Sequence, residues 1–222
     1  MKNTKPAMKQ IALIFSFLLT TGLCLGQENH LKPARDFSRY EGVLKEYYDN
    51  LFLLLYTGFS QKPYARYTSK PSFSQEYAFS VEMIEGKCFI LSNSLSENYW
   101  YAKDKKSVRM DTSKIEINQD LYLKIGELFD LLLKQTKVPE RKFKKGPNGE
   151  VYEIETIVFD GTVYYFTITG KDGKTESGET SSPGKNSVFG RLVKICDELH
   201  SLEFESPLIL KEIDLLVSDL KQ

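Results

Sequence analysis

Two glutamates on one predicted strand have the spacing that carbohydrate hydrolysis needs. Glu153 and Glu155 are two positions apart, and alternate side chains of a strand lie on one face, roughly 7 Å from each other. This separation falls within the range of a glycosidase carboxylate pair. Alternate glutamates are also ordinary on a solvated strand face, so we keep a carboxylate hydrolase as an alternative hypothesis.

Other side chains with catalytic or metal-binding chemistry are few. The chain has two histidines, His30 and His200, and His200 lies off the apolar stripe of a predicted helix, which indicates a surface or edge position. A serine or cysteine nucleophile needs a positioned base, and the sequence has no nucleophile elbow motif. His, Cys and acidic residues do not recur at metal-site spacings. We therefore assign no catalytic residue, no metal site and no cofactor.

Two cysteines follow the N-terminal segment. Cys88 begins an apolar run that ends at Leu91, and Cys196 neighbours the apolar stripe of a predicted helix. Two buried thiols that behave as small hydrophobic side chains are one interpretation. A disulfide between Cys88 and Cys196 is the other, because an oxidising compartment favours one. Redox catalysis is not indicated, since the two residues form no Cys-x-x-Cys pair.

Aromatic residues are the most distinctive feature of the composition, with 13 Tyr, 14 Phe and a single Trp. Tyr99, Trp100 and Tyr101 are consecutive and precede a charged turn. Flat rings stack on sugars and form rigid anchors for protein partners. We predict a ligand-binding platform at these three residues, with a role as core residues at a strand end as the alternative.

The N-terminal segment has the layout of a secretory signal peptide. Three lysines within the first nine residues precede an almost wholly apolar run at 11–19, and Cys24 and Gly26 are small residues suited to cleavage before Gln27. The run is short for a membrane span. Lipid attachment at Cys24 is the alternative, but Leu23 stands where that processing favours a small residue. We predict export of the mature chain to the periplasm or the extracellular medium, with no transmembrane segment after cleavage.

Net charge argues against a nucleic-acid partner. The whole chain has 30 basic and 30 acidic residues, and the first 26 residues hold three lysines and no acidic residue. Their removal leaves 27 basic against 30 acidic residues, a net charge of −3. A chain without a basic excess does not neutralise phosphates well.

A hairpin at the centre of the chain is the element expected to position Glu153 and Glu155. Residues 151–158 and 162–169 are rich in β-branched and aromatic residues, and Asp160-Gly161 between them is a hairpin signal. A three-residue loop, 159–161, would place Phe166 on the buried face and both glutamates with Tyr165 on the solvated face. A second turn at 171–174 leads to a charged strand at 174–180, which we expect at a sheet edge.

The remaining elements predict a single α+β domain. Apolar residues recur at helical spacing in 40–56, 119–134, 188–202 and 206–220. Residues 64–69, 76–93 and 108–117 are typical of strands, with a hairpin turn at Glu85-Gly86. Blocks of strands and helices favour a mainly antiparallel sheet of about six to seven strands with helices packed against it. We expect a signal peptide at 1–26, a flexible lead-in at 27–38 and one domain at 39–222.

This layout is similar to that of small exported bacterial proteins, a likeness that transfers no site residue. The sequence favours a non-catalytic binding or interaction module of the cell envelope, with a protein or glycan surface as its partner. The alternatives are an envelope or glycan hydrolase that uses a carboxylate pair, and a structural or assembly component.

Overall fold

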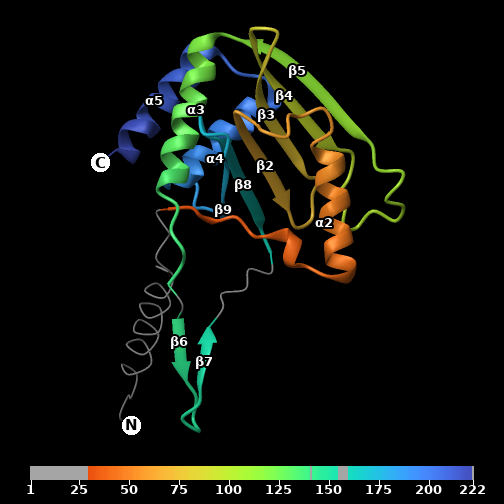
Figure 1. Ribbon diagram of the computed structural model, residues 1–222, viewed down its shortest axis with the longest axis vertical. Helices are drawn as coiled ribbons and strands as arrows, with labels where there is room; N and C mark the ends of the chain where they lie inside the picture. Colours follow the sequence, from red (N-terminus) through yellow and green to blue (C-terminus); the bar gives the residue numbers. More distant parts are fainter. Residues whose placement is uncertain (1–29, 141, 155–159, 222) are drawn as a thin grey trace, which may run out of the picture.

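The computed structural model describes residues 30–140, 142–154 and 160–221 (Figure 1). The helices of this part are α2 (Gly42–Leu55), α3 (Gln119–Lys134), α4 (Val188–Ser201), α5 (Ser206–Leu220) and the short 3-10 helix η1 (Phe37–Arg39). The strands are β1 (Lys32–Pro33), β2 (Ala65–Pro71), β3 (Tyr77–Ile84), β4 (Lys87–Leu95), β5 (Met110–Ile117), β6 (Lys142–Lys145), β7 (Val151–Ile154), β8 (Thr162–Thr169) and β9 (Thr175–Ser181). The predicted signal peptide, with Cys24, lies outside the described residues.

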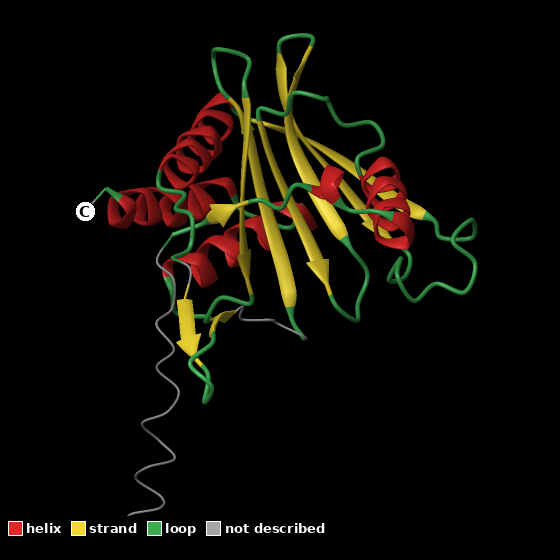
Figure 2. Cartoon of the chain, turned by 60° about the horizontal axis from the view of Figure 1, so that its bottom comes forward, coloured by secondary structure: helices red, strands yellow, loops and turns green. Residues whose placement is uncertain are grey.

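Seven strands form one sheet in the order β1-β9-β8-β2-β3-β4-β5, and every neighbouring pair is antiparallel. Successive side chains of a strand point to opposite faces, so Phe79 packs with α3, α4 and α5 while Ala78 packs with α2. Figure 2 shows the segment with β1 and η1 crossing the sheet toward α2. The predicted α+β class, with helices against a mainly antiparallel sheet, is confirmed.

The predicted hairpin between residues 151–158 and 162–169 is wrong in the part that the structure describes. β7 pairs with β6 in a separate two-stranded ribbon, where Glu153 lies opposite Phe143. β8 pairs on one side with β2, where Tyr67 lies opposite Phe166, and on the other side with β9. A strand has only two hydrogen-bonding edges, and both edges of β8 are occupied. Residues 155–159 lie outside the described part.

The predicted orientation of side chains in β8 is confirmed for Phe166 and wrong for Tyr165. Phe166 is fully buried beneath the helices, as expected. Tyr165, expected on a solvated face, is also buried, because η1 and α2 cover that face: the rings of Phe37 and Phe52 lie 5.7 and 6.2 Å from the ring of Tyr165. A sheet covered on both faces buries side chains of both parities.

From Leu31 onward the predicted lead-in packs against the sheet, and its flexibility stays a prediction. Leu31 is fully buried, and Lys32 pairs with Glu179, so that β1 and not β9 forms the sheet edge. Gly178 allows Leu31 to be buried, because a Cβ atom added at Gly178 would lie 2.9 Å from Leu31 Cδ1. The absence of a side chain at Gly178 therefore makes room for Leu31 in the core.

The four predicted helices and the predicted turn at Glu85-Gly86 are present in the structure. Asn118 Oδ1 accepts from Leu121 N at 2.8 Å and Ser187 Oγ accepts from Gly190 N at 3.0 Å, which caps α3 and α4. Glu85 and Gly86 have φ of 51° and 81°, as a two-residue hairpin turn requires. The residue before α5 is Glu205, whose side chain makes no capping hydrogen bond.

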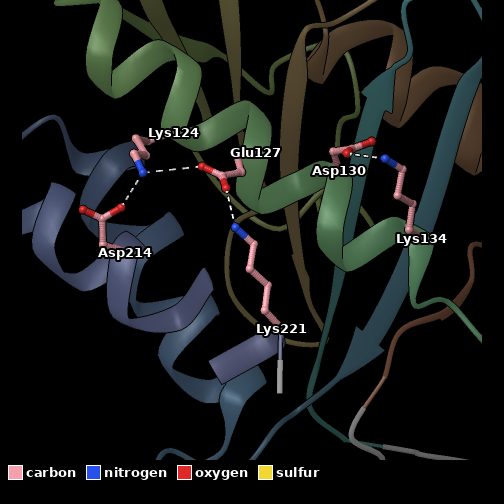
Figure 3. Close-up of polar contacts among 6 residues, drawn as sticks. All are labelled: Lys124, Glu127, Asp130, Lys134, Asp214 and Lys221. Atoms are coloured by element: carbon pink, nitrogen blue, oxygen red, sulfur yellow. Dashed lines mark hydrogen bonds and ion pairs between the residues drawn. The ribbon is translucent and has the colours of Figure 1, made fainter. Parts of the chain in front are cut away.

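Ion pairs connect the outer surfaces of α3 and α5 (Figure 3). Lys124 Nζ lies 2.7 Å from Asp214 Oδ1 and 3.5 Å from Glu127 Oε2, and Lys221 Nζ lies 2.8 Å from Glu127 Oε1. These groups are substantially exposed, where an ion pair contributes about 0–1 kcal/mol. The stability of this helix pair therefore comes mainly from the apolar side chains beneath it, such as Ile125 and Ile213, which are fully buried.

Candidate binding surface around Trp100

The three predicted platform residues separate into one buried ring and two exposed rings. They lie in the connection between β4 and β5, and Tyr99 is buried in the same core cluster as Tyr47 and Leu51 of α2. Trp100 and Tyr101 are 43% and 59% exposed. The structure thus places Trp100 and Tyr101 on the surface, with Tyr99 as the ring that holds this connection to the core.

A buried carboxylate positions Tyr99. Glu76 precedes β3 and its side chain accepts from Tyr99 N at 2.9 Å and from the Tyr47 hydroxyl at 3.2 Å. Burial raises the pKa of Glu76, although both hydrogen bonds act in the opposite direction. Because Glu76 holds the backbone of Tyr99 and a ring of α2 at once, Trp100 is fixed next to α2: its ring meets the ring of Tyr47 edge-on, with centroids 4.8 Å apart.

Asn98 joins this connection to the loop between β2 and β3. Its Nδ2 donates to the carbonyl oxygens of Ser74 at 2.8 Å and Pro71 at 3.3 Å, and its Oδ1 accepts from Tyr101 N at 3.2 Å. The loop carries Phe73, whose ring stacks on the ring of Tyr101 with centroids 5.9 Å apart and planes 22° apart. Asn98 therefore sets the distance between two exposed aromatic side chains.

Lys105 holds the backbone of the same β4-β5 connection through hydrogen bonds from its side chain. Its ammonium group donates to the carbonyl oxygens of Tyr99, Trp100 and Ala102, the last two at 2.6 and 3.1 Å. Three carbonyl acceptors satisfy the three N–H donors of an ammonium group. The backbone on both sides of Trp100 is thus held by side-chain hydrogen bonds, and the exposed rings are preorganised.

Five exposed apolar side chains from three segments form what we call the Trp100 surface. They and their exposed fractions are Val43 (72%), Leu44 (45%), Phe73 (68%), Trp100 (43%) and Tyr101 (59%). Two hollows join them: one of about 250 Å³ touches Val43 and Trp100, and one of about 230 Å³ touches Leu44, Phe73, Trp100 and Tyr101. A group of exposed apolar side chains is typical of an interaction site.

Other predicted residues do not join this surface. Glu153 lies in the β6-β7 ribbon and Glu155 lies outside the described residues. Cys88 and Cys196 are both buried and both free, so the possible disulfide is not formed in the structure. Burial raises the pKa of the Cys196 thiol well above its usual value, which leaves it unreactive.

His200 is more buried than the sequence suggested. Its Nε2 lies 3.1 Å from Ser94 Oγ, its ring packs 4.4 Å from the ring of Tyr77, and burial lowers its pKa. Ser92 Oγ also donates to the carbonyl oxygen of His200 at 2.6 Å. These contacts fasten the C-terminal end of α4 to β4, and neither Ser94 nor His200 lines the cavity beside α4 that is described below. The geometry is that of a structural contact.

Asp197 is the polar residue that the sequence analysis missed. The hydroxyl groups of Tyr67 and Tyr77 each donate to Asp197 Oδ1 at 2.8 Å, and burial raises the pKa of this carboxyl. The available signal was an acidic residue one position after Cys196, within the buried side of a helix. Its partners lie on strands 130 and 120 residues earlier, which helical spacing alone does not reveal.

Comparisons with protein-family models, curated proteins and solved structures found no match to this chain. In residues 30–140, 142–154 and 160–221, no His, Cys, Asp and Glu side chains are grouped so that they could hold a metal ion. No helix in that part of the chain is long and apolar enough to cross a membrane.

Proposed function

We propose that the protein is an exported, non-catalytic binding module that uses the Trp100 surface to bind another protein in the cell envelope. The observation that carries the proposal is the preorganised exposure of Trp100 and Tyr101 beside Phe73. Ordering side chains at an interface costs about 0.5–1.5 kcal/mol for each flexible side chain. Rings that are already held in place avoid much of this cost.

The composition of the surface favours a protein partner over a glycan. Trp and Tyr are enriched among the residues that dominate protein interfaces. Val43 and Leu44 are exposed aliphatic side chains on the outer side of α2, and they add apolar area that a polyhydroxylated ligand would not cover well. The two hollows beside Trp100 could each receive an apolar side chain from the partner.

Site-specific photo-crosslinking tests the proposal. A photoreactive phenylalanine analogue replaces Tyr101 in the expressed protein, and a matched variant carries it at Leu53, which is 77% exposed on α2 outside the Trp100 surface. We expect a discrete protein adduct from position 101, no adduct from position 53, and loss of the first adduct when Trp100→Ala is added. Equal labelling from both positions, or an adduct that survives Trp100→Ala, would refute the proposal.

Export rests on the N-terminal layout and needs its own test. Mass spectrometry of the protein recovered from the cells that make it should show a chain that begins at Gln27. A chain that retains residues 1–26, found in the cytosol, would contradict this part of the proposal, and a lipid-modified Cys24 would replace it with membrane anchoring.

A further inference from the structure

A separate hollow lies beside α4, next to the face of the sheet opposite to α2. Its volume is about 700 Å³, within the range of roughly 300–1,000 Å³ that is usual for small-molecule sites. One side is formed by α4, a second by the loop between β9 and α4, and Tyr164 of β8 also contributes. We call it the α4 cavity. None of its lining residues belongs to the Trp100 surface.

Asp197 is fixed at the wall of the α4 cavity with one oxygen available. Oδ1 accepts from both Tyr67 and Tyr77, and among the described residues no side chain or backbone group donates to Oδ2. Because two hydroxyl groups hold the same oxygen, the carboxylate has a set orientation. Asp197 lines the cavity, so Oδ2 is the oxygen left to accept a hydrogen bond from a ligand.

The other lining residues indicate the chemical class of that ligand. Tyr164, Pro183 and Val193 provide apolar surface, and the ionisable lining groups are Lys185, Lys194, Asp197 and Glu198. Two cations and two carboxyl groups sum to no net charge when all are ionised. A charged ligand would meet a like charge on one side, whereas hydroxyl groups donate to carboxylates and accept from ammonium groups.

We propose that the α4 cavity binds a neutral polyhydroxylated ligand of mono- or disaccharide size, with Asp197 Oδ2 accepting a ligand hydroxyl. The ring of Tyr164 and the side chains of Pro183 and Val193 face the C–H groups of such a ligand, since apolar sugar faces pack against aromatic and aliphatic carbon. Lys185 supplies a donor, and Glu198, whose Oε1 lies 3.4 Å from Lys194 Nζ, supplies an acceptor. This site is independent of the Trp100 surface.

Calorimetry with defined probes tests the proposal. The neutral probes are glucose, N-acetylglucosamine and cellobiose, and the charged probes are lysine and glucuronate. We expect at least one neutral probe to bind and the charged probes not to bind. Asp197→Asn keeps an oxygen for Tyr67 and Tyr77 but turns the ligand-facing acceptor into a donor, so affinity should fall about tenfold or more. Trp100→Ala should leave the affinity unchanged, which separates this site from the proposed function.

A second measurement does not depend on how the variant folds. In the unchanged protein, amide resonances of Ser182, Gly184, Lys185 and α4 should shift when the neutral probe binds, while the indole resonance of Trp100 should not. The proposal is overturned if no neutral probe binds, if a charged probe binds more tightly than all neutral ones, if a well-folded Asp197→Asn binds as the unchanged protein does, or if the shifts occur elsewhere.

Discussion

Replacing Asn98 by alanine should both destabilise the protein and loosen the Trp100 surface. The side chain makes three hydrogen bonds, and it is buried at 8% exposure. Each neutral hydrogen bond contributes about 0.5–1.5 kcal/mol, and the bond to Pro71 O is long at 3.3 Å. We therefore expect Asn98→Ala to lower the free energy of unfolding by about 2 kcal/mol.

Urea unfolding monitored by far-ultraviolet circular dichroism measures this loss, and the fluorescence of Trp100 reports the local change. Asn50→Ala is the matched control: Asn50 is exposed on α2, so its replacement should change stability by less than about 0.5 kcal/mol. Asn98→Asp should cost more than Asn98→Ala, because a carboxylate would face the carbonyl oxygens of Pro71 and Ser74. If Asn98→Ala unfolds at the same urea concentration as the unchanged protein, our account of how the surface is held is wrong.

Three further predictions concern the core, the helix pair and Asp197. Gly178→Ala should lower the free energy of unfolding by about 1–3 kcal/mol, and with it the melting temperature, because the new Cβ would lie 2.9 Å from Leu31 Cδ1. An unchanged melting temperature would mean that β1 is not packed as described. Lys124→Ala breaks the ion pair with Asp214 and should cost less than about 1 kcal/mol in urea unfolding, so a larger loss would contradict the apolar origin of this packing. Burial raises the pKa of Asp197 in the folded state. Its contribution to stability is therefore fully present below the unfolded pKa of about 4 and is lost as pH rises through the folded pKa. Asp197→Asn should remove this pH dependence, and parallel curves of stability against pH for the two proteins from pH 3 to 8 would refute this expectation.

The local signals in the sequence were sufficient for the helices and for the β3-β4 hairpin. Asn118 and Ser187 are residue types that cap helices, and Glu85-Gly86 is a typical turn pair. Such signals can be read from the sequence because capping and turns involve residues only a few positions apart. The error came from Asp160-Gly161, a similar local signal before β8. β8 pairs on one edge with β9, which follows it through the predicted turn at 171–174, and on the other edge with β2, which lies about a hundred residues earlier in the chain. No signal near Asp160-Gly161 indicates the pairing with β2.

In the candidate sites too, local features could be predicted from the sequence and long-range contacts could not. Trp100 and Tyr101 could be singled out because aromatic side chains are distinctive in any sequence. Their exposure could not be predicted, since it depends on Glu76 and Asn98, which bond to residues up to 29 positions away. Leu31 was assigned to a flexible segment because nothing near it in the sequence indicates the space above Gly178. Long-range polar contacts and space for side chains are properties of the folded chain.

Acrylamide quenching of Trp100 fluorescence tests the central claim most directly, because the chain has a single tryptophan. In the free protein the half-exposed ring should be readily quenched. When the partner identified by crosslinking at position 101 is added in excess, we predict a clear drop in the quenching constant that Asn98→Ala weakens. Full complex formation with no change in the quenching constant would contradict binding through the Trp100 surface.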